Sequence, residues 1–344
     1  MAILNFVSVR GLVTNIASTE EAGNKTYVVQ LTVAMSDRDS YASRTGYRLH
    51  NASVPVKSGE KNIVDTISKM SIGDVVSVMG YIATRVGLST KAECPVCHGS
   101  FTAQEAGVVN GRDTKTLTYI LPIGITLVKS AKKTRARIYE KENNKIVESV
   151  EQGLDDALDE LLKEKKEAGE EVKEEDKPTL KEQLEKKLID EKYANKVEEA
   201  HYMYLKNHSE DGNRVIVLGN VVSDPVTGEV DEGRTKYTRF QIAMNRKYHS
   251  TSPDETANIT DYPWVYSYGD GAIKDAQNVR KGSLVLIDGA LQSRKYKDTY
   301  VCPDCGNAYQ VRGRTLEILS YGTEYLEGCG KIEEKEGEEE EKDE

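Results

Sequence analysis

Two pairs of cysteines in this chain have the spacing of metal ligands. Cys94 and Cys97 stand in CPVCHG, and Cys302 and Cys305 stand in CPDCGN. A Cys-Pro-x-Cys turn directs two thiolates at one ion, and Zn²⁺ in a structural site takes four such ligands in a tetrahedron. Because each pair supplies only two ligands, the economical solution is one shared site. The sequence therefore predicts one structural zinc ion per chain, bound by all four cysteines.

Other ligand sets remain open. His98 or Cys329 could complete a site on one pair, or pairs from two chains could meet. A redox role like that of thioredoxin is disfavoured, because no helix start or βαβ pattern follows either pair.

The cysteine pairs belong to an internal repeat. Cys94 precedes Cys302 by 208 residues, and Gly11 precedes Gly219 by the same interval. Two further pairs follow at 209 residues: Gly80 with Gly289, and Arg85 with Arg294. A register kept over more than eighty residues indicates two copies of one small domain.

Each copy reads as three strands, a helix and two more strands. This order is that of the OB-fold, a five-stranded Greek-key barrel. The predicted fold is mainly β with a helical insert, with two such barrels in tandem and a Cys-x-x-Cys knuckle between strands four and five of each. The predicted parts are a first barrel domain (1–128), a charged helical insert (129–212), a second barrel domain (213–327) and an acidic disordered tail (328–344).

The charge of the chain is segregated. The net charge is -10, but residues 148–200 carry -9 and residues 331–344 carry -6, which leaves +5 elsewhere. Mildly basic domains with acidic appendages are typical of a polyanion binder, although a solvated helix surface and a solubilising tail explain them as well. Leucines at helical spacing in 154–162 and 180–189 predict two amphipathic helices that pack or bind a partner; the alternative is a semi-rigid spacer.

An aromatic stripe marks the second copy. In the predicted strand PWVYSY, Trp264, Tyr266 and Tyr268 share one face. Tyr237 and Phe240, on the preceding strand, face opposite ways. Aromatic rings among cations form a stacking platform for unpaired bases, but packing in the core of the barrel is an equal alternative for this strand. The predicted cations of this surface, with one further aromatic residue, are Arg239, Arg246, Lys247, Arg294, Lys295 and Tyr296.

The first copy has fewer such residues. Arg44, Arg48 and Arg85 are candidate phosphate contacts, although a solvated basic surface would look the same. Gly87 takes the place of Tyr296, and the first copy has no Trp. We therefore expect the first copy to bind nucleic acid more weakly.

Several classes of protein are disfavoured. The five histidines stand in no His-Glu-x-x-His pattern, and no Gly-rich lysine loop for phosphates occurs, so an enzyme is not expected. No apolar stretch approaches the length of a membrane span, and the first ten residues lack the pattern of a signal peptide. We expect no membrane association and a bacterial cytoplasmic or nucleoid location, or a phage-infected host.

The second copy resembles bacterial single-stranded DNA-binding proteins. NRVIVLGNVVSDP is similar to the first strand of that family and VRKGSLVLIDGALQSRKY to its fourth strand, while KMSIGDVVSVMGYIATR keeps the latter pattern in the first copy. The resemblance places Trp264 and Tyr268 on the family's base-stacking strand and Tyr296 at another stacking position. This chain departs from the family in its fused barrels, its knuckles and its insert. Its tail ends KDE instead of the family's apolar tip.

We therefore expect a non-enzymatic protein that binds single-stranded DNA without strong sequence preference in replication, recombination or repair. As partners we expect single-stranded DNA and replication or recombination proteins, with the chain a monomer or homodimer. The unusual architecture favours a phage or mobile-element origin. The alternatives are a zinc-stabilised adaptor that recruits replication proteins through its helices, and an RNA-binding module.

Overall fold

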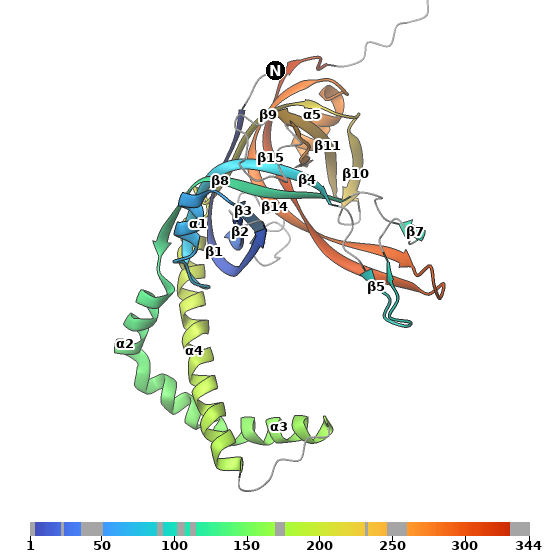
Figure 1. The fold of residues 1–344 in the computed structure, drawn as a ribbon. Helices are drawn as coiled ribbons and strands as arrows, with labels where there is room; N and C mark the ends of the chain where they lie inside the picture. The colour runs from blue at the N-terminus through green and yellow to red at the C-terminus, as the bar shows by residue number, and fades with distance from the viewer. Residues whose placement is uncertain are drawn as a thin grey trace, which may run out of the picture.

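The computed structural model describes residues 4–21, 24–35, 51–87, 92–101, 107–110, 115–168, 176–230, 233–245 and 260–330. Figure 1 shows a body of strongly curved strands from which a helical arm projects. The protein is mainly β, with its longest helices in the arm.

Five strands of the first half close into a ring. They are β1 (Leu4–Glu21), β2 (Asn24–Ala34), β3 (Asn51–Ser58), β4 (Val75–Gly87) and β8 (Lys115–Lys129). β1 pairs with β2, β2 with β3, β3 with β8, β8 with β4, and β4 again with β1; only β3 and β8 run parallel. The short helix α1 (Lys61–Ile67) buries Ile63 and Ile67 against this ring.

The second half repeats this pairing cycle. Its ring consists of β9 (Asn213–Val221), β11 (Thr235–Asn245), β13 (Trp264–Tyr268), β14 (Leu284–Val301) and β15 (Ala308–Glu327). β13 and β15 are the parallel pair, and β9 pairs with both β11 and β14. β10 (Val226–Val230) forms a hairpin with β11, β12 (Thr260–Asp261) pairs with its end, and α5 (Asp270–Asn278) packs against this ring.

The two rings are joined by antiparallel pairing of β1 with β9, in which Val7 lies opposite Val215. These two valines are themselves 208 residues apart, so the pairing is centred on equivalent positions and relates the halves by a local twofold axis. A buried asparagine repeats the same relation. The side chain of Asn5 bonds both backbone groups of Ile82 at 2.8 and 2.9 Å. That of Asn213 bonds both backbone groups of Leu291 at the same distances.

The apolar core runs through both rings. Buried valines, isoleucines and leucines of the two halves form one continuous cluster, because alternate residues of each strand point inward. Gly80 and Gly289 occupy equivalent bulges in β4 and β14. A Cβ atom at either position would lie 2.1 Å from a carbonyl oxygen, that of Leu121 or Leu319, so this close strand approach requires glycine.

The segment after β4 crosses to the second half. It contains β5 (Ala92–Glu93), β6 (Ser100–Phe101) and β7 (Gly107–Asn110). β7 pairs with the far end of β14, where the β14–β15 hairpin extends well beyond the ring (Figure 1). A second junction lies at Asp261, whose fully buried carboxylate accepts a bond of 2.6 Å from the Thr84 amide.

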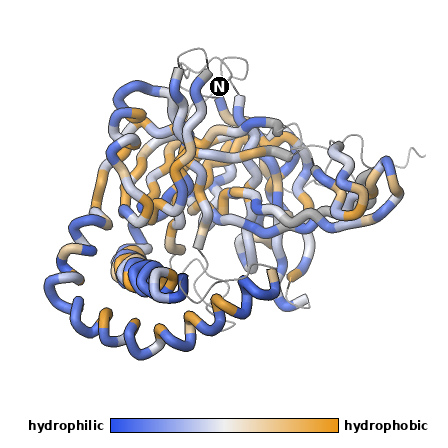
Figure 2. Tube along the Cα trace, turned by 60° about the horizontal axis from the view of Figure 1, so that its bottom comes forward, coloured by the Kyte–Doolittle hydropathy of each residue, from blue (hydrophilic) through white to orange (hydrophobic). Residues whose placement is uncertain are grey.

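The arm consists of α2 (Ala131–Glu151), α3 (Leu154–Glu167) and α4 (Lys177–Asn207). The leucine pattern predicted two helices here, whereas the described residues of this segment form three. The prediction missed α2 because this helix buries only Ile146 and Val150, which is too sparse an apolar pattern to stand out. Figure 2 shows accordingly that most residues of the arm are hydrophilic.

The arm is attached to the first ring through α4. The buried ring of His201 lies 2.7 Å from both the Thr134 hydroxyl and the Gly73 carbonyl, and Leu205 packs with Leu12 and Val75. None of the described helices is long and apolar enough to span a membrane. The tail predicted to be disordered lies, from residue 331, outside the described residues. The four-part division of the chain stays a prediction.

Candidate nucleic-acid interface

The four knuckle cysteines meet. Their sulfur atoms all lie within 4.8 Å of one another. Cys94 Sγ is 3.7 Å from Cys305 Sγ, and Cys97 Sγ is 3.6 Å from Cys302 Sγ. Each close contact therefore joins one knuckle to the other, in the crosswise manner that a local twofold axis requires.

The two knuckles have the same backbone geometry. The amide of Cys94 donates to the Gly99 carbonyl at 3.0 Å, and that of Cys302 donates to the Asn307 carbonyl at 2.9 Å. The residue after each second cysteine has a positive φ, 58° at His98 and 71° at Gly306. His98 is the only non-glycine residue with a positive φ in the described part of the chain, so the turn is imposed by the knuckle itself.

The spacing of the sulfur atoms and the environment of Cys94 suit a cation. Backbone amides of Cys97 and Val96 lower the pKa of the Cys94 thiol to about 6, because they stabilise its thiolate. The Zn–S distance of about 2.3 Å places the sulfurs of a ZnS₄ tetrahedron about 3.8 Å apart, close to the two cross-knuckle distances. The alternative ligands lie elsewhere. His98 Nδ1 is 3.1 Å from Glu93 Oε1, and Cys329 Sγ is directed at backbone carbonyls, 3.3 Å from that of Glu327.

An aromatic and cationic face covers β11 and β13. The strand register places Tyr237 opposite Tyr268, Arg239 opposite Tyr266, and Gln241 opposite Trp264. Because strand residues alternate between faces, all six side chains project to the same side. Phe240, on the opposite side of β11, is fully buried in the core. The three rings of Tyr237, Tyr266 and Tyr268 stack in a row, with centroids 6.1 and 6.4 Å apart.

The members of this face differ in exposure. Trp264 and Tyr268 are half-buried, whereas Tyr266 is only 4% exposed. Its ring is covered by its tyrosine neighbours and by two guanidinium groups, with Arg239 on one side and Arg294 5.2 Å from the ring centroid. Tyr266 therefore supports the face from beneath, and direct contact of its ring with a base stays a prediction.

Arg239 bridges the tryptophan and the tyrosine row. Its guanidinium lies 5.4 Å from the Trp264 ring and donates to the Tyr266 hydroxyl at 3.3 Å. Its Nε atom is buried without a hydrogen-bond partner among the described residues. A cation held flat against an indole keeps its remaining donors available to an anionic ligand.

Arg294 has a different role. It makes three hydrogen bonds of 2.9 to 3.2 Å to the carboxylate of Glu317, which is fully buried. This pairing raises the pKa of Arg294 further, against the effect of burial. The prediction from the sequence placed Arg294 among the DNA contacts but missed Glu317. The only signal was an acidic residue within the apolar run of LEIL.

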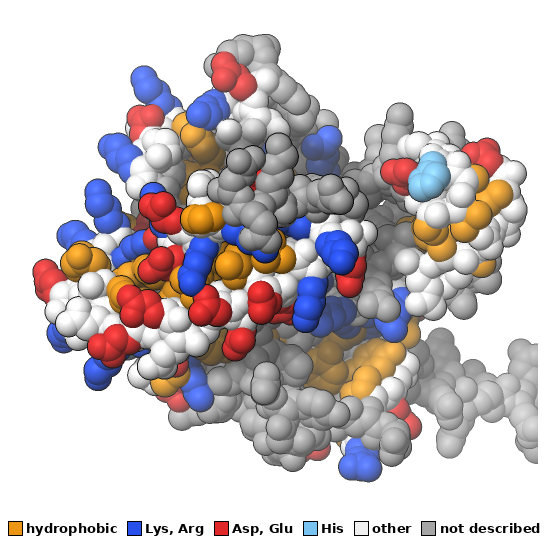
Figure 3. Space-filling model, turned by 90° about the horizontal axis from the view of Figure 1, so that it is seen from below, with side chains coloured by type: hydrophobic (Ala, Val, Ile, Leu, Met, Phe, Trp, Pro, Cys, Tyr) orange, Lys and Arg blue, Asp and Glu red, His pale blue; other side chains and the backbone are white. Residues whose placement is uncertain are grey.

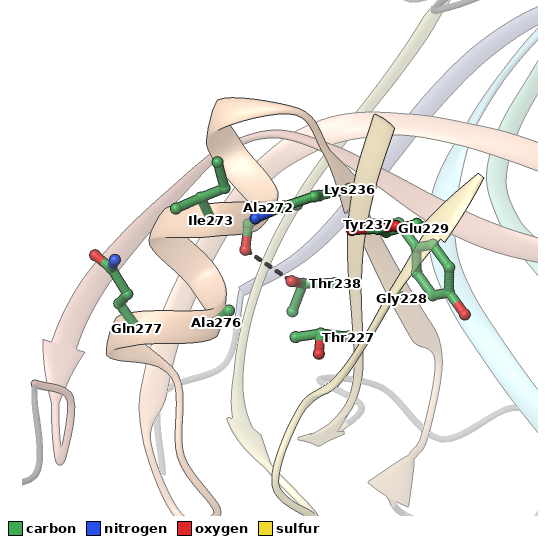
Figure 4. A pocket seen from close by; sticks show the side chains of 10 residues that line it. All are labelled: Thr227, Gly228, Glu229, Lys236, Tyr237, Thr238, Ala272, Ile273, Ala276 and Gln277. Atoms are coloured by element: carbon green, nitrogen blue, oxygen red, sulfur yellow. Dashed lines mark hydrogen bonds between the residues drawn. The ribbon is translucent and has the colours of Figure 1, made fainter. Parts of the chain in front are cut away.

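A pocket of about 480 Å³ lies on the other side of β11 (Figure 4). It is formed between α5 and the β10–β11 hairpin, where the Thr238 hydroxyl donates to the Ala272 carbonyl at 2.7 Å. Figure 4 shows the ring of Tyr237 turned away from α5 and toward Gly228. Tyr237 therefore borders both the pocket and the aromatic face.

Comparison with known proteins identifies the family. Residues 212–301 match the model of the single-strand binding protein family. The chain is 30% identical over 131 residues to a single-stranded DNA-binding protein of Caldanaerobacter subterraneus, covering 37% of this chain and 79% of that protein. This chain belongs to the single-strand binding protein family. It is also 36% identical over 85 residues to single-stranded DNA-binding protein 2 of Chlorobaculum tepidum, which is 25% of this chain and 57% of that protein.

The match to other family members is partial. The chain covers 57% and 49% of the length of the relatives from Chlorobaculum tepidum and Rhizobium meliloti. A crystal structure of the single-stranded DNA binding protein from Thermus aquaticus aligns over 94% of this chain and 93% of that one, with a TM-score of 0.48 and 11% identity.

The structure also places some of the remaining residues that the sequence predicted as DNA contacts of this family member. Lys295 and Arg85 are exposed on β14 and β4, at nearly equivalent positions of the two rings. Tyr296 lies on β14 opposite Gly313. Four predicted cations fall outside the described residues: Arg44, Arg48, Arg246 and Lys247. Their contacts with nucleic acid stay predictions.

Proposed function

We propose that this protein binds single-stranded DNA through two OB-folds in tandem, without strong sequence preference, and protects exposed strands in replication, recombination or repair. The observation that carries the proposal is the face of Trp264, Arg239 and the tyrosine row, within the segment that matches the family model. Exposed aromatic rings stack on any base, and the cations beside them attract the phosphates. The proposed surface also includes Lys295, Tyr296 and the four cations outside the described residues.

We further propose one structural zinc ion per chain, held by Cys94, Cys97, Cys302 and Cys305. The crosswise sulfur distances support one shared site over two separate ones. With four thiolate ligands the ion has no open position for catalysis, so its contribution is to hold the knuckles together. Because one knuckle comes from each half, the ion would fix the two rings relative to each other.

The test is titration of a labelled dT oligomer with the wild-type protein and with Trp264→Ala. Loss of one stacking aromatic costs about 1 to 3 kcal/mol per base, so we expect affinity to fall roughly 5- to 150-fold. Tyr262→Ala, which removes an aromatic residue that is 40% exposed outside this row, is the matched control and should bind nearly as the wild type does. Equal affinity of Trp264→Ala and the wild type would refute the stacking assignment.

The same titration separates the other functions. Preference for a matched rU oligomer over dT would favour an RNA-binding module, because the rings accept bases of either nucleic acid. No binding of either oligomer would favour the adaptor, whose recruiting element would be the arm.

A further inference from the structure

The helix α2 carries a row of cations on its outer surface. Lys133, Arg137 and Lys141 are four residues apart and exposed, so they lie above one another about 6 Å apart along the helix. We call these three residues the α2 ridge. They belong to none of the surfaces described above.

The ridge points away from the rest of the arm. The face of α2 that meets α4 is marked by Tyr139, Asn143 and Ile146: Tyr139 stacks on Tyr193, and Asn143 accepts from the Tyr193 hydroxyl at 2.6 Å. At 100° per residue, Arg137 lies almost diametrically opposite the buried Ile146. The ridge therefore faces solvent rather than the helix that α2 packs on.

Several other cations of the arm are held in ion pairs. Arg135 pairs with Asp190, Lys196 with Glu142, and Lys181 with Asp155. The three ridge residues form no ion pair with any residue that the structure describes. Figure 3 shows Lys and Arg side chains fringing the left side of the arm, the side on which α2 lies in Figure 1.

The charge of the arm changes sign along the chain. Residues 129–147 contain seven cations and two carboxylates, whereas residues 148–200 contain ten cations and nineteen carboxylates. The first stretch begins at the first ring, and the second contains α3 and most of α4, whose last turns return to the ring. Like charges four residues apart destabilise a helix by about 0.2 to 0.5 kcal/mol per pair, and cations near a helix N-terminus oppose its dipole. The ridge therefore lowers the stability of α2. A stabilising role in this helix does not explain the presence of the three cations.

We propose that the α2 ridge is a second contact surface for single-stranded DNA, which binds the phosphates of a strand that leaves the aromatic face. This inference rests on the proposed function. The ligand chemistry is the sugar-phosphate backbone, because the ridge offers cations and no exposed ring. The acidic distal arm repels the strand and confines it to the base of the arm.

The test is the salt dependence of binding by the triple variant Lys133→Gln, Arg137→Gln, Lys141→Gln. Each phosphate contact contributes about 0.7 to the slope of log K against log salt for a single strand, so three contacts contribute about 2. We therefore consider a dT oligomer of about 70 nucleotides and a roughly fourfold rise in salt concentration. The affinity of the wild type should fall about 20-fold more than the affinity of the variant. A dT oligomer of about 15 nucleotides, which one barrel accommodates, should show no difference.

The matched control removes three exposed cations from the acidic part of the arm: Lys163→Gln, Lys166→Gln, Lys186→Gln. It changes the net charge equally and should keep the wild-type slope at both lengths. The same slope in both triple variants would overturn the inference, because the effect would then be one of net charge. An equal change at both lengths would also overturn it and would point to a contact of the ridge within the protein. Failure of the wild type to bind either oligomer would instead refute the proposed function.

Discussion

Replacement of Arg294 should destabilise the fold more than it weakens DNA binding. The Glu317 carboxylate is 0% exposed and accepts three hydrogen bonds from Arg294. Removing one partner of a buried ion pair costs about 3 to 5 kcal/mol, since the other charge stays buried without compensation. The Arg294 side chain is 36% exposed, which lets water reach the edge of the site and places the expected cost near the lower end, about 3 kcal/mol.

The experiment compares urea denaturation of Arg294→Met with that of Lys295→Met, followed by Trp264 emission. Lys295 is the next residue on β14 and is exposed on the opposite face. Lys295→Met should therefore change the free energy of unfolding by less than about 0.5 kcal/mol. The double variant Arg294→Met, Glu317→Leu removes both charges and should recover most of the loss, because apolar replacement of a whole buried pair is often neutral.

DNA affinity provides the second measurement. The Nε and Nη2 atoms of Arg294 are held by Glu317, which fixes the guanidinium beside Tyr266, and Arg294→Met should change affinity less than about threefold once folded protein is compared. A stability loss below about 1 kcal/mol, or a double variant no more stable than the single one, would show that the buried pair does not carry this energy.

Two other properties can be tested on the purified protein. Elemental analysis should give one zinc per chain, and Cys302→Ser should lose the metal and lower the melting temperature; two zinc ions per chain would contradict the shared site. Burial raises the pKa of Asp275, despite hydrogen bonds such as the one of 2.7 Å from the Tyr325 hydroxyl. A carboxyl whose folded pKa lies above its usual value of about 4 favours folding at low pH, and this contribution is lost as pH rises through the raised value. Asp275→Asn should therefore flatten the fall in melting temperature above about pH 4, and an unchanged pH profile would contradict this.

The repeat made the relation between the halves predictable. The interval of 208 residues that joins Cys94 to Cys302 also joins Val7 to Val215, where β1 and β9 pair. A duplicated strand that pairs with its own copy generates a twofold axis, and that axis brings the knuckles together. The clustering of the four cysteines thus follows from symmetry that the sequence already contains.

Burial within the aromatic stripe was not predictable in the same way. Alternation correctly placed Trp264, Tyr266 and Tyr268 on one face but gives no ranking of their exposure. That ranking depends on Arg239 and Arg294, which come from other strands and both contact the central ring, that of Tyr266. The length of β14 and β15 was not predictable from alternation either, because their distal parts are polar and are stabilised by pairing with each other and with β7.

The two rings are unequal as platforms for bases. Val56 pairs with Ile120 in the first ring as Val265 pairs with Ile318 in the second, so positions on β3 and β13 correspond at an interval of 209. Pro55, Lys57 and Gly59 therefore stand where the second ring has Trp264, Tyr266 and Tyr268. The counterparts of Arg294 and Glu317 are Arg85 and Tyr119, so the ion pair is not repeated in the first ring, where the ring of Tyr119 lies 5.9 Å from the Lys57 ammonium. The described positions of this face in the first ring therefore offer no ring for a base. The duplicated fold retains its symmetric junctions at Asn5, Asn213 and the cysteines, while we expect base stacking mainly in the second half.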